Sequence, residues 1–421
     1  MQRRATIAAE TTLVKSAQEA LDIVLAHAAV LPSEGVPLAD VVGRVLAEDV
    51  RADADFPPFD RSAMDGYAVR AEDVAAAPVT LPVVAQVRAG QVSDRVLGAG
   101  QAIQIMTGAP VPPGATAVQQ VEKTRATDDG RSVEILSPVE PEMNISRRGT
   151  EVKDGDVVLV RGERIDPAAL AVLASVGSER VVVSRRPRVC VLVTGDELVD
   201  VHERPGPGQI RNSNGYAVEA QAREAGAIVR SLGIVPDDSE RIRGAMAIGL
   251  ESDLLLLSGG VSEGVFDLVE GVMTRLGIEI LFDKVAIKPG APLVFGRRGP
   301  TLVFGLPGNP VSAQVTFDLF VRPALLRMQG ARVAARPLVA AELLEGVGNR
   351  SGRKAHLPAR VHFEGGRFVA RPVRSMGSAD LVAHARANAM VILDAERSRA
   401  EAGEWAPVLL LGNFLERDGA A

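Results

Sequence analysis

Between residues 187 and 330, continuous apolar runs alternate with segments of helical character, and this pattern constrains the fold more than any other feature of the sequence. The runs cover residues 189–193, 254–257, 292–295 and 301–304. Such runs are typical of strands that are buried on both faces of a parallel sheet. Helix-like segments at 215–226, 239–251 and 267–277 separate several of the runs. We therefore predict a doubly wound α/β domain here.

The sequence on either side of this region has a different character. Apolar spacing predicts a helix within 13–31 and another short amphipathic segment at 36–50. From 54 to 149, short strand-like stretches alternate with Pro- and Gly-containing turns, which predicts a β-rich domain. Residues 150–185 return to a mixed pattern, in which Asp166 and Pro167 open a helix. Residues 332–421 again favour strands.

Composition excludes several classes of protein. The net charge of the 421 residues is −6 and aromatic residues make up 3%, which excludes a strongly basic nucleic-acid binder with stacking platforms. A single cysteine, Cys190, excludes an intrachain disulfide framework, and its apolar neighbours predict a buried core position. No apolar stretch has the length of a signal-peptide core or of a membrane span. We expect a soluble cytoplasmic protein that binds neither nucleic acid nor membranes.

Polar loops follow three of the four apolar runs. They read Thr194-Gly-Asp-Glu197, Ser258-Gly-Gly-Val-Ser262 and Gly305-Leu-Pro-Gly-Asn-Pro310. Because ligands bind in open α/β sheets at the carboxyl ends of the strands, parallel strands would bring these loops together at one edge. Their hydroxyls, their glycines and the Asn309-Pro310 helix start suit an anion held by backbone N–H groups.

Charged residues near these loops complete the predicted crevice. Glu197 and Asp267 offer carboxylates, and Lys284 and Lys288 offer ammonium groups. Two carboxylates 4 Å apart repel by about 4 kcal/mol at an effective dielectric near 20, so converging acids need a cation. A phosphorylated ligand held with Mg²⁺ fits this set. Ordinary alternatives remain open for each motif alone: a tight turn, a helix cap and a solvated strand face. Walker A and Rossmann glycine fingerprints are absent from the sequence.

A second polar constellation lies far away in the sequence. The segment Pro57-Pro-Phe-Asp-Arg-Ser-Ala-Met-Asp-Gly-Tyr67 sets Asp60, Arg61, Ser62 and Asp65 among apolar residues. Polar groups in such surroundings need hydrogen-bond partners if they are buried. Physical reasoning alone favours a rigid surface turn with an Asp60–Arg61 pair.

This segment resembles the Phe-Asp-x-Ser-Ala-Met-Asp-Gly-Tyr-Ala signature of the molybdopterin molybdenumtransferases, which include the MoeA proteins and the E-domain of gephyrin. Further motifs similar to those of this family follow in order along nearly the whole chain. They are 105–110, Asn144 with 147–149, 194–198, 258–262 with Asp267, Lys284 with 288–290, and 305–312.

The resemblance implies a multidomain α/β plus β fold with four parts. These are a discontinuous mixed helical domain (1–53 plus 150–185), a β-rich inserted domain (54–149), a three-layer α/β molybdopterin-binding domain (186–331) and a C-terminal β-barrel domain (332–421). It also implies a homodimer with the active cleft between subunits, and transient contact with other proteins of molybdenum-cofactor synthesis.

The implied reaction inserts molybdenum from molybdate into adenylylated molybdopterin, with Mg²⁺ and release of AMP. The resemblance gives catalytic roles to Asp65, Glu197 and Asp267, with Asp65 positioning the metal or the attacking water. It assigns metal binding to Glu197, Asp267 and Glu151. The implied substrate and nucleotide contacts are Thr107, Thr194, Gly195, Asp196, Ser258, Gly259, Gly260, Ser262, Lys284, Lys288, Pro307, Gly308, Asn309, Arg374 and Ser378.

Three positions depart from the family pattern. Glu151 stands where Asp is usual, Glu263 replaces a small apolar residue, and Ala291 replaces a common Lys. Two other functions are weighed against the transferase. A non-catalytic scaffold would bind a partner peptide at a dimer edge without nucleotide. Adenylyl transfer by the α/β domain alone would consume ATP with molybdopterin.

Overall fold

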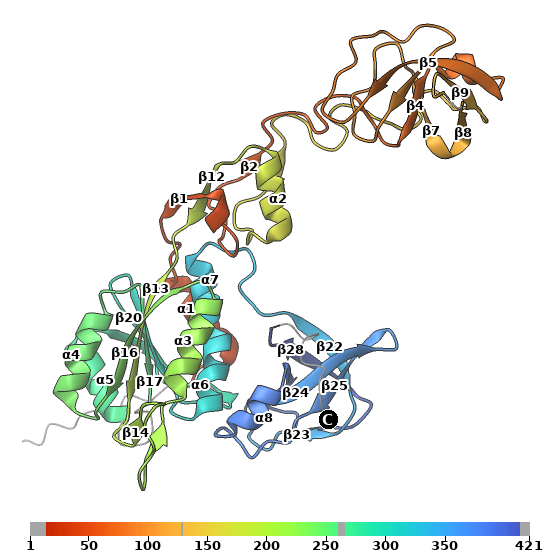
Figure 1. The fold of residues 1–421 in the computed structure, drawn as a ribbon. Helices are drawn as coiled ribbons and strands as arrows, with labels where there is room; N and C mark the ends of the chain where they lie inside the picture. Colours follow the sequence, from red (N-terminus) through yellow and green to blue (C-terminus); the bar gives the residue numbers. More distant parts are fainter. Residues whose placement is uncertain (1–13, 128, 260–265, 413–421) are drawn as a thin grey trace, which may run out of the picture.

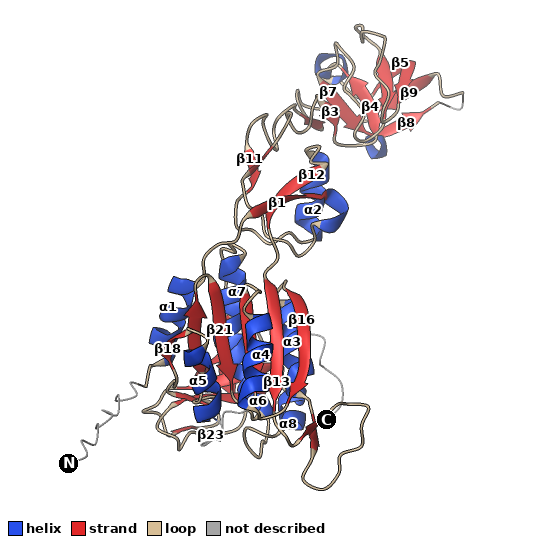
Figure 2. Cartoon of the chain, turned by 90° about the vertical axis from the view of Figure 1, so that its left-hand side faces the viewer, coloured by secondary structure: helices blue, strands red, loops and turns tan. Residues whose placement is uncertain are grey.

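The computed structural model describes residues 14–127, 129–259 and 266–412. It shows an elongated chain with four units, confirming the predicted fold class (Figure 1). The β-rich inserted unit lies at one end, a small mixed unit follows it, and the α/β unit and the C-terminal barrel lie side by side at the other end (Figures 1 and 2).

The α/β unit is built on one mixed sheet with the strand order β16-β13-β17-β21-β20-β18. Its strands are β13 (Arg188–Thr194), β16 (Ile228–Val235), β17 (Leu254–Ser258), β18 (Glu279–Phe282), β20 (Val294–Arg298) and β21 (Thr301–Leu306). The first four strands in the sheet order run parallel. The expectation of a parallel strand at 292–295 was wrong, because β20 pairs antiparallel with β21. The two residues that join them are too few for a parallel crossover.

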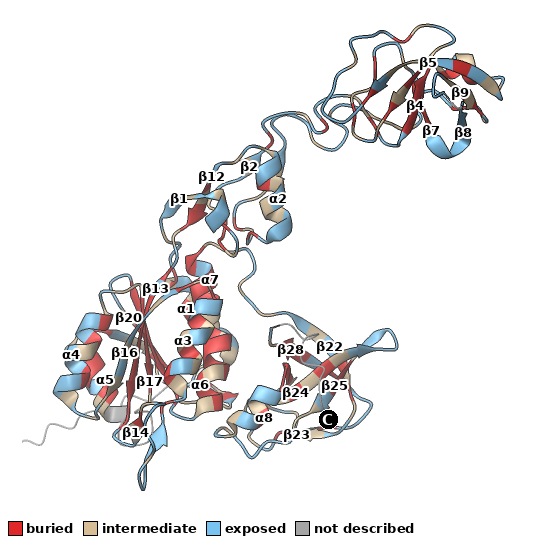
Figure 3. Cartoon of the chain, viewed as in Figure 1, coloured by how far each residue is buried: buried red, intermediate tan, exposed pale blue. Residues whose placement is uncertain are grey.

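Helices cover both faces of this sheet. Alternate residues of β13 point to opposite layers: Val189 and Val191 join one apolar cluster, and Cys190 and Leu192 join the other. The helices are α1 (Ala17–His27), α3 (Asn214–Glu224), α6 (Pro310–Thr316) and α7 (Arg322–Met328) on the first face, and α4 (Ser239–Gly249) and α5 (Phe266–Arg275) on the second. A π-helical stretch, Phe317–Val321, links α6 to α7. The strands β13, β17 and β21 in the middle of the sheet are therefore buried on both sides (Figure 3).

Cys190 is a core residue, as predicted. It is fully buried, and burial raises the pKa of its thiol to about 11. A thiol with that pKa stays protonated at neutral pH and is a poor nucleophile.

The small mixed unit joins segments that are distant in sequence. Strand β1 (Ser33–Pro37) pairs with β12 (Arg180–Ser184), and β2 (Val50–Arg51) pairs with β11 (Val157–Leu159). Helix α2 (Pro167–Ser175) begins where predicted, with Asp166 as its N-cap. The amphipathic segment at 36–50 forms no α-helix. It contains the 3₁₀ helix η1 (Leu38–Asp40) and isolated bridges, and Gly43 with φ of +80° breaks any helical continuation.

The inserted unit is β-rich, as predicted. Its sheet has the order β7-β4-β6-β5-β9-β8. The strands are β4 (Gly66–Val69), β5 (Val79–Val87), β6 (Ala102–Ile105), β7 (Ala117–Gln120), β8 (Thr124–Ala126) and β9 (Ser132–Ile135), with β3 (Arg61–Ser62) paired to β10 (Ile145–Ser146) outside it. The 3₁₀ helices η2 (Ala71–Val74) and η3 (Val121–Lys123) complete the unit.

The C-terminal unit is a closed five-stranded barrel, as predicted. It closes because β24 pairs with both β25 and β26. The strands are β22 (Leu338–Leu343), β24 (Lys354–Glu364), β25 (Arg367–Pro372), β26 (Ala389–Leu393) and β28 (Trp405–Leu410), with β23 (Val347–Gly348), β27 (Arg399–Ala400) and α8 (Leu381–Arg386) beside them. A short strand from the α/β unit, β19 (Ile287–Lys288), pairs with β24 and ties the two units together.

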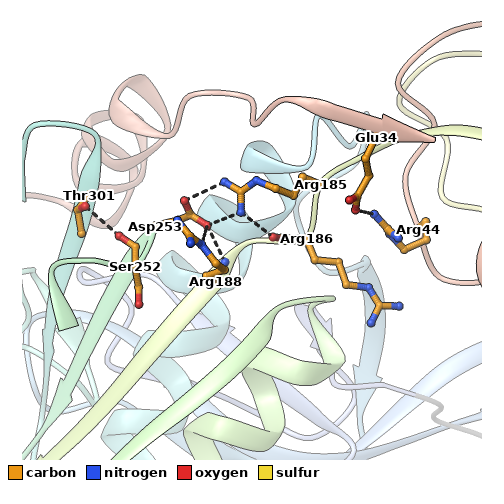
Figure 4. Close-up of polar contacts among 8 residues, drawn as sticks. All are labelled: Glu34, Arg44, Arg185, Arg186, Arg188, Ser252, Asp253 and Thr301. Atoms are coloured by element: carbon orange, nitrogen blue, oxygen red, sulfur yellow. Dashed lines mark hydrogen bonds and ion pairs between the residues drawn. The ribbon is translucent and has the colours of Figure 1, made fainter. Parts of the chain in front are cut away.

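Buried and half-buried ion pairs also fasten the units. Arg185 donates to both carboxylate oxygens of Asp253 at 2.8 and 2.9 Å, and the backbone N–H of Arg188 donates to the same group (Figure 4). Burial by itself would raise the pKa of Asp253, but these donors outweigh it and lower the pKa. Arg336, at the start of the C-terminal unit, pairs with Asp318 at 2.7 Å. Among the helices of the described ranges, none is long and apolar enough to cross a lipid bilayer.

Candidate functional site

A cavity of about 1080 Å³ lies between the carboxyl edge of the α/β sheet and the C-terminal barrel. Many of the residues that the sequence singles out line it. They are Thr194, Glu197, Ser258, Gly259, Lys288, Pro307, Gly308, Asn309 and Ser378. A volume of this size is in the range of sites that hold nucleotide-sized ligands.

The described residues of the three predicted loops meet at one edge of the sheet. Val193 pairs with Ser258 across β13 and β17, and Ser258 pairs with Leu306 across β17 and β21. The side chain of Asn214, at the start of α3, donates to Ser258 Oγ at 3.0 Å and to the Gly308 carbonyl at 2.8 Å. One amide therefore holds two of the loops together.

Gly259 allows the loop after β17 to approach its neighbour. Its φ is +102°, and a Cβ added to it would lie 2.1 Å from the carbonyl oxygen of Thr194. A Cβ on Gly308 would in turn contact the Cα of Gly259 at 3.9 Å. The contact of 3.9 Å is an ordinary one, so the close approach to Thr194 depends on the missing side chain of Gly259 and not on that of Gly308.

Asn309 links the sheet edge to the barrel. It occupies the N-cap position of α6, with Pro310 in the first turn, but its side chain does not cap the helix. The Asn309 amide instead donates to Ser378 Oγ at 2.9 Å, and the backbone N–H of Val311 donates to the Ser378 carbonyl at 3.0 Å. The segment around Ser378 is thus fixed at the rim of the cavity.

The barrel side of the cavity is cationic. Lys288 of β19 lies beside Ala355 of β24, and Arg353 and His356 also line the cavity. Neither Lys288 nor Arg353 forms an ion pair with another described residue. His356 is 4% exposed, and burial lowers its pKa to about 4, with the charge of Lys354 adding to the shift. Its imidazole is therefore neutral at pH 7.

Acidic residues gather at the sheet edge beside Glu197. The backbone N–H of Asp237, just after β16, donates to Asp196 at 3.1 Å. Asp237 Oδ1 is buried and has no hydrogen-bond partner among the described residues. Burial raises the pKa of Asp237, and the charges of Asp196 and Glu197 raise it further. No three His, Cys, Asp or Glu side chains in the described ranges form a complete metal cluster.

Other predicted residues lie elsewhere. Lys284 is exposed outside the cavity lining, as is Arg374, although Ser375 beside it does line the cavity. Gly195 and Asp196 follow β13 next to the lining residues. Gly260 and Ser262 lie outside the described residues, and so do Glu263 and the side chain of Asp267, whose backbone belongs to α5.

Asp65 and Thr107 form a separate polar site on the inserted unit. The backbone N–H and the hydroxyl of Thr107 donate to Asp65 Oδ1 at 2.7 and 3.0 Å. These two hydrogen bonds lower the pKa of the Asp65 carboxyl. The bond from the backbone N–H lowers it more than the bond from the hydroxyl does. Phe59 and Met64 near it are 42% and 43% exposed.

The expected Asp60–Arg61 pair was wrong. Asp60 pairs with Arg147 and accepts from the backbone N–H of Arg148, whereas Arg61 pairs with Glu151 at 2.7 Å. Both pairs bridge the two chain segments that lead into and out of the inserted unit. Glu151 is therefore held by Arg61 and is not among the residues that line the cavity.

The structure does not bring Asp65 to Glu197 within one chain. The inserted unit lies at the far end of the molecule from the α/β unit and the barrel in both views (Figures 1 and 2). Sequence analysis also missed Asn214, Asp237, Arg353 and His356. Of these, Asp237 carried a usable signal, because it follows a parallel strand at the same edge as the predicted loops.

Comparison with known proteins identifies the family of this chain. A model of the MoeA N-terminal region (domain I and II) matches residues 15–177, a probable molybdopterin-binding domain matches 190–327, and the MoeA C-terminal region (domain IV) matches 340–411. The molybdopterin molybdenumtransferase of Bacillus subtilis (strain 168) is 38% identical over 386 residues, covering 90% of each chain. The chain belongs to the molybdopterin molybdenumtransferase (MoeA) family.

Other relatives agree with this assignment. A molybdopterin molybdenumtransferase of Staphylococcus epidermidis (strain ATCC 12228) is 34% identical over 94% of this chain and 95% of its own. The crystal structure of the molybdopterin biosynthesis moeA protein from Pyrococcus horikoshii OT3 superposes with a TM-score of 0.81 at 32% identity, covering 94% of this chain and 100% of that one. The family resemblance predicted from the sequence motifs is thus confirmed.

Proposed function

We propose that this protein inserts molybdenum from molybdate into adenylylated molybdopterin and releases AMP. The observation that carries the proposal is the cavity, which collects glycine-lined loops, hydroxyls and two unpaired cations from the α/β edge and the barrel. Such a site suits a ligand with several anionic groups. Family membership and the relatives' printed names support the same substrate class.

Within this proposal, the two sides of the cavity have different tasks. Ser258, Gly259 and Asn309 lie at the sheet edge, where hydroxyl, amide and backbone groups would hold the nucleotide phosphate. Lys288 and Arg353 lie toward the barrel and would hold the second anion, molybdate. Each charge-assisted hydrogen bond of this kind contributes about 1.5–3 kcal/mol.

The acidic edge fits Mg²⁺. Asp237 has a buried carboxylate oxygen without a hydrogen-bond partner among the described residues. Burial and the charges of Asp196 and Glu197 raise its pKa, so a bound cation would reduce the repulsion among these carboxylates. Mg²⁺ usually binds through one or two carboxylates plus phosphates and waters, so a complete protein cluster is not required. Glu197 and Asp237 would hold the ion, with Asp267 as the third candidate from the sequence. When bound, Mg²⁺ would neutralise phosphate oxygens.

We further propose that the protein acts as a homodimer in which Asp65 of the partner subunit reaches this cavity. In one chain the two sites lie far apart, and Phe59 and Met64 are exposed next to Asp65. Docking of this face against a second copy would cover the apolar side chains and complete the site.

Asp65 would then act on the hydrolytic half of the reaction. One water adds across the phosphoanhydride: its oxygen bonds to one phosphorus, and the bridging oxygen leaves with the other. The Thr107 donors lower the pKa of Asp65, so the carboxylate is ionised at neutral pH and can orient that water as an acceptor.

The test is release of AMP from adenylylated molybdopterin in the presence of Mg²⁺ and molybdate. The proposal expects AMP and metal-loaded cofactor in equal amounts, with no consumption of ATP. Absence of turnover by the wild-type protein would contradict it. Consumption of ATP with molybdopterin alone would favour adenylyl transfer instead.

A further inference from the structure

His356 has an unusual setting within the cavity. It lies on β24, two residues after Lys354, and faces Ile392 of β26 across the barrel sheet. The residue is 4% exposed, yet it belongs to the cavity lining together with Lys288 and Arg353. Its Nδ1 is buried and has no hydrogen-bond partner among the described residues.

A buried imidazole nitrogen without a partner is costly, because its hydrogen bonds to water are lost and not replaced. A core histidine with a purely structural role normally donates one ring N–H to a backbone carbonyl or a carboxylate. His27 shows that arrangement, with its Nδ1 2.8 Å from the carbonyl of Ile23. His356 lacks it among the described residues, which leaves a bound molecule as the candidate partner.

The charges around His356 indicate that the bound molecule is an anion. Lys288 and Arg353 line the same side of the cavity without ion-pair partners in the described chain. These two side chains supply the positive charge for an anion. Burial and the charge of Lys354 keep the imidazole neutral, so it adds a directed N–H without adding a third charge.

We infer that His356 contacts the substrate and orients a tetrahedral oxyanion in the barrel side of the cavity by donating an imidazole N–H to one of its oxygens. The inference rests on the proposed function, because that function supplies two such oxyanions: molybdate, and the phosphate of the nucleotide. Lys288 and Arg353 attract the oxyanion, and His356 selects its orientation.

The experiment measures binding of molybdate alone and of AMP alone to the full-length protein by titration calorimetry. His356→Leu removes both ring nitrogens at similar volume, and His356→Gln restores an amide N–H. We expect His356→Leu to weaken binding of one ligand by about ten-fold or more, and His356→Gln to stay within about three-fold of wild type. The ligand that is affected identifies which oxyanion His356 contacts.

Two results would overturn the inference: His356→Leu binding both ligands as tightly as wild type, or His356→Gln binding as weakly as His356→Leu. If wild type binds neither ligand, the proposed function fails as well, so the two failures can be told apart. Should His356→Leu not fold, NMR of the five histidines in the wild-type protein decides. The ring nitrogens of His356 must shift when the oxyanion is added, and unchanged shifts contradict the inference.

Discussion

The cavity and the inserted unit show two ways of presenting functional side chains. The cavity is assembled within one chain from distant segments, which parallel strand pairing, the Asn214 amide and the Asn309–Ser378 contact hold in place. Asp65 is held by Thr107 on a separate unit, where the residue is exposed. The cavity is therefore complete within one chain, whereas the chemistry that we propose requires a second copy.

The substitution with the largest expected effect on activity is at Asp65, and it tests whether the inserted unit supplies the chemistry. Asp65→Asn keeps the shape of the side chain but removes the carboxylate charge that would orient water. We expect AMP release to fall by about 10²- to 10⁴-fold, with the affinity for AMP unchanged, because Asp65 is proposed to orient the attacking water and not to hold the nucleotide. Steady-state kinetics and calorimetry measure the two quantities separately.

Asp129 provides a matched control on the same unit. It accepts from the backbone N–H of Arg131 at 3.0 Å and the hydroxyl of Thr127 at 2.9 Å, much as Asp65 accepts from Thr107, and its pKa is also lowered. Asp129→Asn should leave turnover at the wild-type rate. Equal turnover by Asp65→Asn and Asp129→Asn would show that Asp65 has no role in the reaction.

The next largest effect is expected on molybdate binding in the cavity. Lys288→Ala should weaken molybdate binding by about ten- to a hundred-fold, because it removes one of two unpaired cations. The exposed Lys153, which lies outside the cavity lining, is the control for a general change in charge. If Lys153→Ala weakens binding as much as Lys288→Ala, the cavity is not the oxyanion site.

Gly259→Ala tests whether the loops at the sheet edge must pack this closely. The added Cβ would lie 2.1 Å from the Thr194 carbonyl oxygen, so we expect a loss of about 1–3 kcal/mol in the free energy of unfolding and weaker AMP binding. Urea denaturation and calorimetry measure the two effects. Gly277→Ala is the control, because Gly277 also has a positive φ, +71°, but nothing within 4 Å of the added Cβ. Equal losses in both variants would assign the effect to backbone strain alone.

The smallest effect is a shift in pH dependence. A lowered pKa keeps Asp65 ionised, so activity persists above that pKa and is lost as the pH falls through it. Thr107→Val removes the smaller of the two donors, which raises the pKa and moves the acid limb of kcat/KM upward by less than about one pH unit. Thr107→Ser keeps the hydroxyl and should show the wild-type profile. An unmoved limb in Thr107→Val would mean that another group controls it.

Much of the fold could be predicted from the sequence because burial leaves a strong local pattern. Continuous apolar runs identified β13, β17 and β21, and the loops after them marked the carboxyl edge where the cavity lies. The direction of β20 was missed, because an apolar run looks the same in either orientation and only its short link to β21 reveals the hairpin.

The site was harder to predict where partners come from distant segments. Nothing local to Asp60 or Arg61 indicates that their partners are Arg147 and Glu151, since sequence neighbours are the nearest candidates until the fold is known. His356 shows no metal-ligand spacing, and its importance appears only when β19 pairs with β24 and the cavity forms beside it. Such residues are defined by tertiary contacts and not by a motif.

A heterodimer of two defective chains tests the central claim most directly. Asp65→Asn and Lys288→Ala chains with different tags are co-expressed, and the mixed dimer is isolated by two affinity steps. If Asp65 of one subunit serves the cavity of the other, one of the two sites is intact and the mixed dimer should release AMP at about half the wild-type rate. At a molybdate concentration that fills the wild-type site but not the weakened Lys288→Ala site, each variant homodimer should remain nearly inactive. A mixed dimer no more active than the two parents would contradict a site shared between subunits.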